Sequence, residues 1–325
     1  MSRIVLLFTG GTISMKHDAA AGGAVPTLRG PDIIGLVPSI ANFAEIEIDD
    51  WAAHPGPHMT IERMWELRGR IVKHLERADV DGVVVTHGTD ALEETAYLMA
   101  RSIASDKPVV VTGAMRTSSD LGWDGPANLG GAVLVAAHAE SRGLGVLVVM
   151  SDRIFAALDV TKTHTHALDA FDSPGLGPLG VIDDGTVIYR RLMPAMPLVI
   201  VPKKLAEPVD IFYTCSGADS RLLDASREEG KGIVIAAMGR GNVPPAMVPG
   251  IERWIADDKP VVITSRAMRG RVGHTYAYAG GGRQLAGLGA IFGGARRPIQ
   301  ARMELMLAVG DGMTVTQIRQ LLEGS

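Results

Sequence analysis

Short, uninterrupted runs of apolar residues recur along the first half of this sequence and alternate with longer segments of helical periodicity. Runs of this kind, bounded by glycine or polar residues, are typical of strands that are buried on both faces of a sheet. Because the strands alternate with amphipathic helices, the pattern predicts a doubly wound, mainly parallel α/β sheet. The predicted strands are residues 4–8, 82–86, 109–112 and 146–150, together with 45–49, where apolar and polar residues alternate.

The helical segments between these strands carry recognisable start signals. Thr60 precedes seven apolar residues that recur at helical spacing between Ile61 and Leu75, and it is the predicted N-cap of that helix. Asp90 and Glu93, three residues apart, resemble a capping pair at the start of the next helix. Further helices are predicted at 31–40, 91–103 and 126–139.

A stretch rich in proline interrupts the alternation and divides the chain into two predicted domains. We expect residues 191–208 to be a semi-rigid linker between a larger domain, 1–190, and a smaller α/β domain, 209–325. The prolines of this stretch are Pro194, Pro197, Pro202 and Pro208. The smaller domain has predicted strands at 209–214, 232–237 and 261–264 and predicted helices at 220–229, 247–256, 299–309 and 314–322.

Composition and charge narrow the partners and the compartment. The net charge is −4 and no long basic run occurs, so we expect neither nucleic acid nor an anionic membrane as a partner. No apolar run approaches the roughly 20 residues of a membrane-spanning helix, and we expect a cytoplasmic protein. Cys215 is the only cysteine, which excludes an intrachain disulfide, and we expect it to be a small buried strand residue.

Hydroxyl side chains follow three of the predicted strands at the point where each strand ends. T-G-G-T begins at Thr9, T-H-G-T-D at Thr86 and T-G-A-M-R at Thr112. Carboxyl ends of parallel strands meet at one edge of the sheet, where open α/β sheets bind ligands, so we expect these turns to form a polar pocket. A strand followed by glycine also fits a plain turn, a P-loop or a dinucleotide fold. The glycine-rich residues 16–25 lack periodicity and are predicted to be a mobile lid over the pocket.

The predicted pocket contains the groups needed to hydrolyse an unactivated amide, namely a nucleophile, a base and donors for the oxyanion. Thr12 and Thr89 supply hydroxyls, Asp90 supplies a carboxylate, and Lys162 lies in a long polar loop, residues 151–178. A lysine that loses its charge beside such a pocket can act as the base for a threonine. These residue types are also common in ordinary turns, so a purely structural role is the alternative.

Taken together, the motifs resemble those of the bacterial-type L-asparaginase (asparaginase/glutaminase) family, of the cytoplasmic type. T-G-G-T-I at 9–13 and T-H-G-T-D-A-L-E-E-T-A at 86–96 are similar to its two signatures. Further matches follow in the same order at 112–116, 124–128, 159–163, 177–180 and 239–243, so the resemblance covers essentially the whole chain. It implies a larger N-terminal and a smaller C-terminal α/β domain, a homodimer or homotetramer, and neither cofactor nor metal.

The resemblance also implies an activity, the hydrolysis of L-asparagine to L-aspartate and ammonia, and roles for individual residues. Thr12 corresponds to the nucleophile. Thr89, Lys162 and Asp90 correspond to a second polar triad, in which the lysine activates the threonine or a water and the carboxylate binds the substrate α-amino group. Which threonine attacks, and whether an acyl-enzyme is obligatory, stays open. The implied substrate-binding residues are Gly11, Gly56, His58, Gly88, Thr89 and Asp90, with the backbone of 88–91 as oxyanion hole.

Two positions depart from the family pattern. The lid tyrosine is missing, because no tyrosine precedes Tyr97. The serine that binds the substrate carboxylate is replaced by Gly56, which leaves that contact to backbone N–H groups and His58 and predicts a lower affinity. The role of the lid tyrosine is either vacant or filled by Tyr276 or Tyr278. Residues that could contribute from a lid or a partner subunit are Asn242, Tyr276 and Tyr278.

Three other readings of the sequence are weaker. A metal hydrolase would need more than the pairs His54 and His58 or His164 and His166, which no carboxylate-rich cluster accompanies. A dinucleotide-dependent oxidoreductase would need a G-x-G-x-x-G motif, which is missing. A non-catalytic amino-acid-binding relative would not need both threonines and the lysine. Preference for asparagine over glutamine depends on one methylene, and a glutaminase-asparaginase of broader specificity is the alternative.

Overall fold

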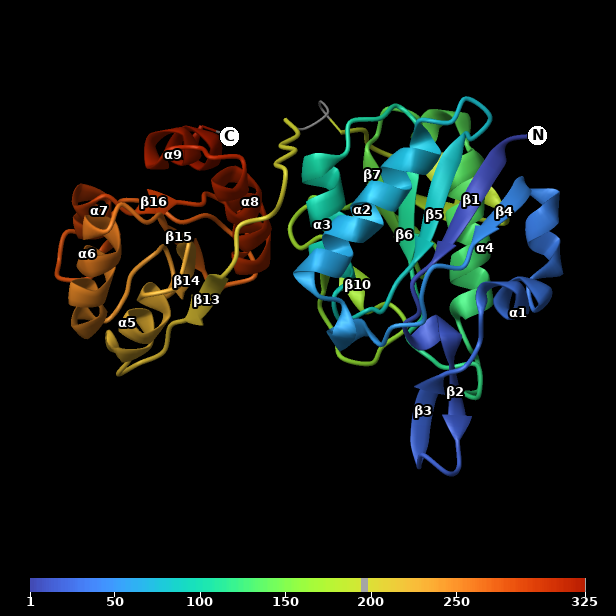
Figure 1. Ribbon diagram of the computed structural model, residues 1–325, viewed down its shortest axis with the longest axis horizontal. Helices are drawn as coiled ribbons and strands as arrows, with labels where there is room; N and C mark the ends of the chain where they lie inside the picture. Colours follow the sequence, from blue (N-terminus) through green and yellow to red (C-terminus); the bar gives the residue numbers. More distant parts are fainter. Residues whose placement is uncertain (194–197, 325) are drawn as a thin grey trace. The chain divides into compact units, whose positions relative to one another are not determined.

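The computed structural model of the protein describes residues 1–193 and 198–324. The chain forms two compact units, Met1–Val199 and Ile200–Ser325. The first contains a mainly parallel sheet and the second a parallel sheet, each with helices (Figure 1). The predicted α/β class, with a larger N-terminal and a smaller C-terminal domain, is confirmed. The bounds of the linker at 191–208 stay a prediction, and its residues Pro194 and Pro197 lie outside the described residues.

The N-terminal unit contains an eight-stranded sheet in the order β12-β11-β8-β7-β6-β5-β1-β4. Its strands are β1 (Arg3–Phe8), β4 (Glu45–Asp49), β5 (Gly82–Thr86), β6 (Val109–Thr112), β7 (Val146–Met150), β8 (Arg153–Ala156), β11 (Gly180–Asp183) and β12 (Thr186–Tyr189). The first five pair in parallel, as predicted. The sheet then continues with antiparallel strands, because Ser151 and Asp152 adopt the left-handed backbone conformation and turn the chain directly from β7 into β8.

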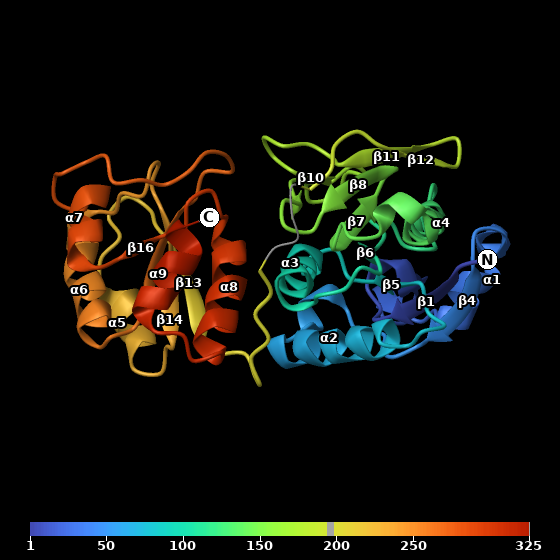
Figure 2. The same ribbon diagram turned by 90° about the horizontal axis from the view of Figure 1, so that it is seen from above.

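Helices cover both faces of this sheet, and the central strands are therefore apolar without interruption (Figure 2). The helices are α1 (Gly30–Gly35), α2 (Ile61–Leu75), α3 (Leu92–Ser102) and α4 (Gly125–Ala137), with short 3₁₀ turns at Thr12–Ser14, Pro38–Asn42, Gly56–His58 and Ala139–Ser141. In β1, Val5 and Leu7 belong to the core under α2 and α3, whereas Ile4, Leu6 and Phe8 belong to the core under α1 and α4. Successive residues of the strand thus fill two separate cores.

The local start signals predicted α2 correctly and misread α3. The Thr60 hydroxyl accepts a hydrogen bond of 3.3 Å from the backbone N–H of Arg63, which confirms the N-cap of α2. Helix α3 begins after Ala91 and has no side-chain cap. The predicted capping pair of Asp90 and Glu93 was wrong, because both carboxylates bond to a segment that is distant in the sequence.

The predicted irregular lid is an antiparallel hairpin that projects from the N-terminal unit (Figure 1). Its strands are β2 (Met15–Asp18) and β3 (Gly23–Pro26). The expectation of a segment without regular structure was wrong, because strand pairing is a backbone interaction that does not require apolar periodicity. The backbone N–H of His17 donates to Ser119 Oγ at 3.0 Å, and the N–H of Ser118 donates to the Met15 carbonyl at 3.1 Å, so the loop after β6 holds the hairpin base.

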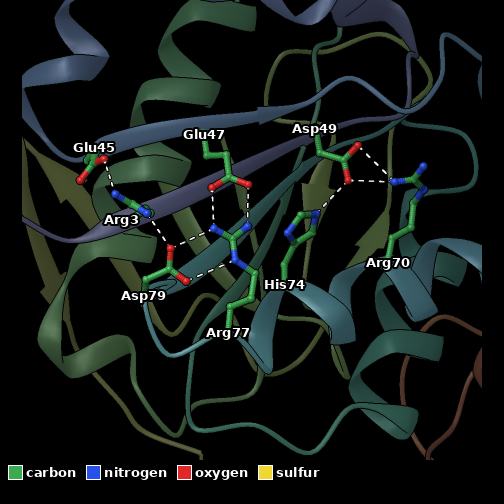
Figure 3. Close-up of polar contacts among 8 residues, drawn as sticks. All are labelled: Arg3, Glu45, Glu47, Asp49, Arg70, His74, Arg77 and Asp79. Carbon is green, nitrogen blue, oxygen red and sulfur yellow. Dashed lines mark hydrogen bonds and ion pairs between the residues drawn. The ribbon is translucent and has the colours of Figure 1, made fainter.

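Strand β4 forms one edge of the sheet and is lined by ion pairs (Figure 3). Arg77 donates to both carboxylate oxygens of Glu47 at 2.6 and 2.8 Å, and Arg3 donates to Glu45 at 2.7 Å. Asp79 joins these pairs, because it accepts from both arginines. Charged side chains on an edge strand oppose its pairing with another chain.

The C-terminal unit is a four-stranded parallel sheet with helices on both faces. Its strands are β13 (Val209–Tyr213), β14 (Gly232–Ala237), β15 (Val261–Ser265) and β16 (Ile291–Phe292). Its helices are α5 (Arg221–Arg227), α6 (Val248–Ala256), α7 (Gly282–Leu288), α8 (Pro298–Gly310) and α9 (Val315–Glu323), with a 3₁₀ turn at Pro245–Met247. Strand β16 and helix α7 were not predicted, because glycine-rich sequence surrounds both. Cys215 lies beyond the end of β13 and is exposed, so its predicted burial was wrong.

Within residues 1–193 and 198–324, every helix is too short or too polar to serve as a membrane span.

Candidate functional site

The carboxyl ends of β1 and β5 lie side by side, next to the edge strand β4, since Phe8 pairs with Thr86 in parallel register. Each strand continues into a glycine-containing turn that carries one of the candidate threonines. The T-G-G-T turn is fixed from a third segment, because the N–H of Gly11 donates to the His54 carbonyl and the N–H of His54 donates to the Thr9 carbonyl, both at 2.8 Å.

Three glycines from these segments are in close backbone contact. A Cβ added to Gly11 would lie 2.5 Å from the backbone nitrogen of Gly88. A Cβ added to Gly88 would in turn lie 2.4 Å from the Cα of Gly56. No side chain larger than hydrogen fits at the first two positions without moving backbone, so glycine here sets the spacing between the turns. The structure therefore brings Gly11, Gly56 and Gly88 together.

Lys162 connects the second threonine with the neighbouring carboxylate. Its Nζ lies 3.0 Å from Thr89 Oγ1 and 2.7 Å from Asp90 Oδ1. The side chain of Lys162 is 17% exposed and that of Asp90 is 62% exposed, so the pair lies at the mouth of the site. Thr89 itself is 5% exposed. A nearly buried hydroxyl held by an amine is the arrangement that a threonine–lysine proton transfer requires.

Lys162 reaches this position because two contacts fix its backbone. It belongs to β9 (Thr161–Lys162), which pairs antiparallel with β10 (Phe171–Asp172), so that Lys162 lies opposite the fully buried Phe171. The backbone N–H of Lys162 also donates to Glu93 Oε2 at 3.1 Å. The long polar loop predicted at 151–178 thus contains three short strands, and one of them delivers the lysine to the end of β5.

Thr12 takes no part in the hydrogen bonds of Lys162 with Thr89 and Asp90. It begins the 3₁₀ turn Thr12–Ser14 and is half-buried, and within the described residues its hydroxyl has no hydrogen-bond partner. Lys162 is within hydrogen-bonding distance of Thr89, whereas among the described residues no side chain bonds to the hydroxyl of Thr12. Thr12 is thus a free hydroxyl at the same edge of the sheet, whereas Thr89 is already engaged.

The turn after β5 also supplies backbone donors. Among the described residues, the N–H groups of Gly88, Thr89 and Asp90 donate to no acceptor. Several unpaired N–H groups in one turn can donate hydrogen bonds to a developing oxyanion.

The fully buried imidazole of His87 forms a hydrogen bond with the backbone of this turn. His87 Nδ1 lies 2.8 Å from the Gly88 carbonyl oxygen, and His87 Nε2 lies 3.0 Å from Thr95 Oγ1. Burial lowers the pKa of His87 to about 4, against a smaller opposite effect of its bond to the Gly88 backbone. The ring is therefore neutral at physiological pH, donates to the carbonyl and accepts from the threonine.

A surface cavity of about 350 Å³ opens beside Lys162. Its lining residues are Asp90, Glu93, Lys162, Thr163, His164 and Thr165. Thr12 and the three glycines do not line it, so this cavity alone does not join the two threonines.

The remaining predicted binding residues have different surroundings. The imidazole of His58 is exposed, and it makes no hydrogen bond with any described residue. In the C-terminal unit, Asn242 Oδ1 accepts from the N–H of Gly282 at 3.2 Å. The rings of Tyr276 and Tyr278 stack with centroids 5.5 Å apart, and both are exposed. Asn242 and Tyr278 share the lining of a cavity of about 400 Å³.

The histidine pairs weighed as metal ligands do not form part of a larger cluster. Among residues 1–193 and 198–324, no three His, Cys, Asp or Glu side chains lie where they could jointly hold a metal ion.

Sequence reasoning missed two residues of this site. Glu93 was taken as part of a helix cap, and its contact with Lys162 joins positions 69 residues apart, which no local pattern reveals. His87 is part of the T-H-G-T-D motif, but the sequence alone assigned it no role. Its position directly after an uninterrupted apolar strand was the available signal, because a histidine there is buried and needs two partners.

Comparisons with known proteins agree along the whole chain. The family model "Asparaginase, N-terminal" matches residues 3–194, and "Glutaminase/Asparaginase C-terminal domain" matches residues 208–322. An L-asparaginase from Bacillus licheniformis is 36% identical over 311 residues, which are 95% of this chain and 96% of that protein. A probable L-asparaginase from Deinococcus radiodurans is 35% identical, with 99% and 97% covered. The crystal structure of a probable cytoplasmic L-asparaginase from Campylobacter jejuni has a TM-score of 0.89 and 34% identity, with 99% of each chain covered.

Proposed function

The chain belongs to the bacterial-type L-asparaginase family, and from that premise we propose that this amidohydrolase converts L-asparagine to L-aspartate and ammonia through a threonine nucleophile. The single observation that supports the site best is the contact of Lys162 Nζ with both Thr89 and Asp90. It puts a base, a hydroxyl and a carboxylate at one strand end, as amide hydrolysis requires.

In the proposed reaction, Thr12 Oγ1 attacks the side-chain amide carbon of the substrate. The unpaired N–H groups of residues 88–90 stabilise the negative charge that develops on the amide oxygen. The C–N bond then breaks, the proton of the threonine leaves with the nitrogen as ammonia, and an ester of Thr12 remains.

The pair of Thr89 and Lys162 completes the proposed cycle. Lys162 Nζ accepts a proton through Thr89 from the water that attacks the ester carbon. The ester C–O bond then breaks, the proton passes from Lys162 to Thr12 Oγ1, and aspartate is released. Asp90, at 62% exposure, keeps an oxygen available for the α-ammonium group of the substrate. Backbone groups near Gly11, Gly56 and Gly88, together with His58, receive the α-carboxylate in this scheme.

A broader glutaminase-asparaginase activity is the second candidate. It is supported by the match to a C-terminal domain described for both activities. The two substrates differ by one methylene, which is worth about 1 to 3 kcal/mol of discrimination in a pocket.

We also propose that the enzyme acts in the cytoplasm as a homodimer or homotetramer. The cytoplasmic assignment is supported by the Campylobacter jejuni relative, which is described as a probable cytoplasmic enzyme. In the assembly, Asn242, Tyr276 and Tyr278 contribute to the site of a partner subunit, with a tyrosine in place of the missing lid tyrosine.

Ammonia release from asparagine, glutamine and short β-aspartyl amides, with and without EDTA, tests the function directly. We expect turnover of asparagine that EDTA does not change. Inactivity on all of these substrates would overturn the proposal, and loss of activity in EDTA would indicate a metal hydrolase.

Two variants test the residue roles. We expect Thr12→Ala and Lys162→Met each to lower kcat by at least about 100-fold, because nucleophile and base contribute factors of this size. Lys73→Met, at an exposed lysine of α2, is the matched control and should keep full activity. Circular dichroism should show an intact fold in all three. Near-normal activity of Thr12→Ala or Lys162→Met would remove that residue from the mechanism.

A further inference from the structure

The motif D-G-P-A-N at 124–128 has no role in the mechanism described above. Its two polar side chains nevertheless form hydrogen bonds with turns at the edge of the sheet that carries the candidate site. Asp124 accepts hydrogen bonds from the backbone N–H of Met115, at 2.9 Å, and of Arg116, also at 2.9 Å. Asn128 lies in the first turns of α4 and is 3% exposed. Together they hold the turn that follows β6.

Asn128 bonds in two directions from one amide group. Its Nδ2 donates to the Gly113 carbonyl at 3.0 Å and to Asp124 Oδ2 at 2.9 Å. Its Oδ1 accepts from the backbone N–H of Ser151 at 2.9 Å. One buried side chain thus ties the turn after β6 to the turn between β7 and β8.

The first of these turns supports Thr89. A Cβ added to Gly113 would lie 2.6 Å from the His87 carbonyl oxygen and 3.3 Å from Thr89 Cγ2. The Gly113 backbone therefore lies against the methyl group of the threonine, so a shift of this turn would displace the Thr89 side chain. The bond from Asn128 to the Gly113 carbonyl fixes that position.

The second turn begins the segment that leads to Lys162. Ser151 and Asp152 have φ values of 52° and 57°, a conformation that non-glycine residues adopt only when the surroundings hold it. Strand β8 starts from this turn, and the chain then runs on to β9 and Lys162. The hydrogen bond from Ser151 to Asn128 is a contact that holds the turn in place.

We propose that Asn128 is a positioning residue that sets the distance between Lys162 Nζ and Thr89 Oγ1, through its simultaneous bonds to the turns after β6 and β7. The proposal rests on the proposed function, in which these two atoms exchange a proton. Asp124 assists Asn128 by orienting its amide. Neither side chain touches the reacting atoms in this scheme.

Asn128→Ala tests the proposal most directly. It removes the bonds to both turns, and we expect kcat to fall by about 100-fold while KM stays within about 3-fold, because a displacement near 1 Å between reacting groups has an effect of this size. Asp124→Asn is the milder second variant. It keeps an oxygen for the two backbone N–H groups and places an NH₂ group against the Asn128 amide, and we expect a kcat loss of about 10-fold.

Ser141→Ala is the matched control, in the 3₁₀ turn that follows the opposite end of the same helix. Ser141 is fully buried, and its hydroxyl donates to the Val135 carbonyl at 2.6 Å. We expect its thermal midpoint to fall, as that of Asn128→Ala does, with kcat unchanged. If both positioning variants fold and keep kcat within about 2-fold of the wild type, the proposal is wrong. It is equally wrong if their kcat falls only as far as that of Ser141→Ala.

Hydrogen exchange separates this proposal from the proposed function. We expect the amides of Ser151 and Met115 to exchange faster in Asn128→Ala than in the wild type, and at wild-type rates in Ser141→Ala. If the wild type is inactive on asparagine and the variants still show this exchange pattern, the assigned substrate is wrong. The role of Asn128 in holding the two turns would then still stand. Unchanged exchange at Ser151 and Met115 would overturn the role of Asn128 whatever the substrate is.

Discussion

At the scale of single residues, the contact between Gly11, Gly88 and Gly56 determines how closely three turns approach one another. The first two glycines have no room for a side chain, since a Cβ on either meets backbone at 2.5 Å or less. Gly56 differs from them. A Cβ added there would lie 3.4 Å from Asp90 Cβ and 3.6 Å from Asp90 Oδ2, which is ordinary van der Waals contact. A small side chain at position 56 is therefore accommodated beside the carboxylate of the site.

This difference leads to a prediction about affinity. Gly56→Ser places a hydroxyl next to Asp90 and adds a donor for the substrate carboxylate, so we expect KM for asparagine to fall by about 10-fold, because a hydrogen bond to a charged group contributes about 1.5 kcal/mol or more. Gly88→Ala is the steric control and should lose activity, because its methyl group meets Gly56 Cα. Steady-state ammonia release measures both. A KM for Gly56→Ser equal to or above that of the wild type would contradict the proposed carboxylate site.

At the scale of secondary-structure elements, β4 shows how the fold protects the edge of its sheet. Glu45, Glu47 and Asp49 occur at every second residue, and each bonds to a basic side chain (Figure 3). Asp49 accepts from Arg70 at 3.1 Å and lies 2.8 Å from His74 Nε2, both on α2. The alternation that predicted this strand therefore reflects a row of carboxylates along the edge, where unpaired backbone groups would otherwise invite another strand.

Asp79 gives this network a pH dependence that can be measured. Its hydrogen bond with Arg77, and secondarily that with Arg3, lowers the pKa of Asp79 from an ordinary 3.8 to about 2. A carboxyl group with a lowered pKa stabilises the fold fully above its ordinary pKa, and this contribution disappears as the pH falls toward 2.

We expect Asp79→Asn to be less stable than the wild type near pH 6 and to differ less from it at each step between pH 4 and pH 2. The urea midpoint as a function of pH measures this difference. A constant difference across the pH range would mean that the bonds of Asp79 do not stabilise the fold.

At the scale of the whole molecule, the two units carry opposite net charge. Residues 1–199 contain 24 acidic and 16 basic side chains, whereas residues 200–325 contain 12 and 16. The segment 259–303, which includes Tyr276 and Tyr278, has no carboxylate side chain at all. Opposite charges on two parts of one chain favour association of the C-terminal unit of one copy with the N-terminal unit of another. This charge distribution supports the proposed contribution of Asn242 and the tyrosines to a partner's site.

Complementation between two inactive variants tests this contribution. In the proposed assembly, Lys162→Met and Asn242→Ala change opposite halves of one site, so a hybrid dimer would have one site with both changes and one site with neither. After mixing under mild denaturant and refolding, we expect about a quarter of wild-type activity, since half of the dimers are hybrids with one intact site each. Ammonia release from the mixture measures it. Activity no higher than that of the separately refolded variants would place Asn242 outside the partner's site.

The sequence by itself determined the parts of this enzyme that depend on short-range pattern. Apolar runs gave β1, β5, β6 and β7, since a strand buried on both faces must be apolar throughout. Thr60 marked the start of α2, because capping is a contact between neighbours in the chain. The order of the motifs also identified the family, to which both domain models assign the chain.

The tertiary structure alone decided which of these residues meet. Asp90 and Glu93 had the spacing of a helix cap, yet they bond to Lys162, some 70 positions further along the chain. The polar loop became a set of short strands that deliver this lysine, and Asn128 became the link between two turns. The physical reason is that periodicity and propensity describe one segment at a time, whereas the distance between two side chains is fixed by the packing of all segments between them.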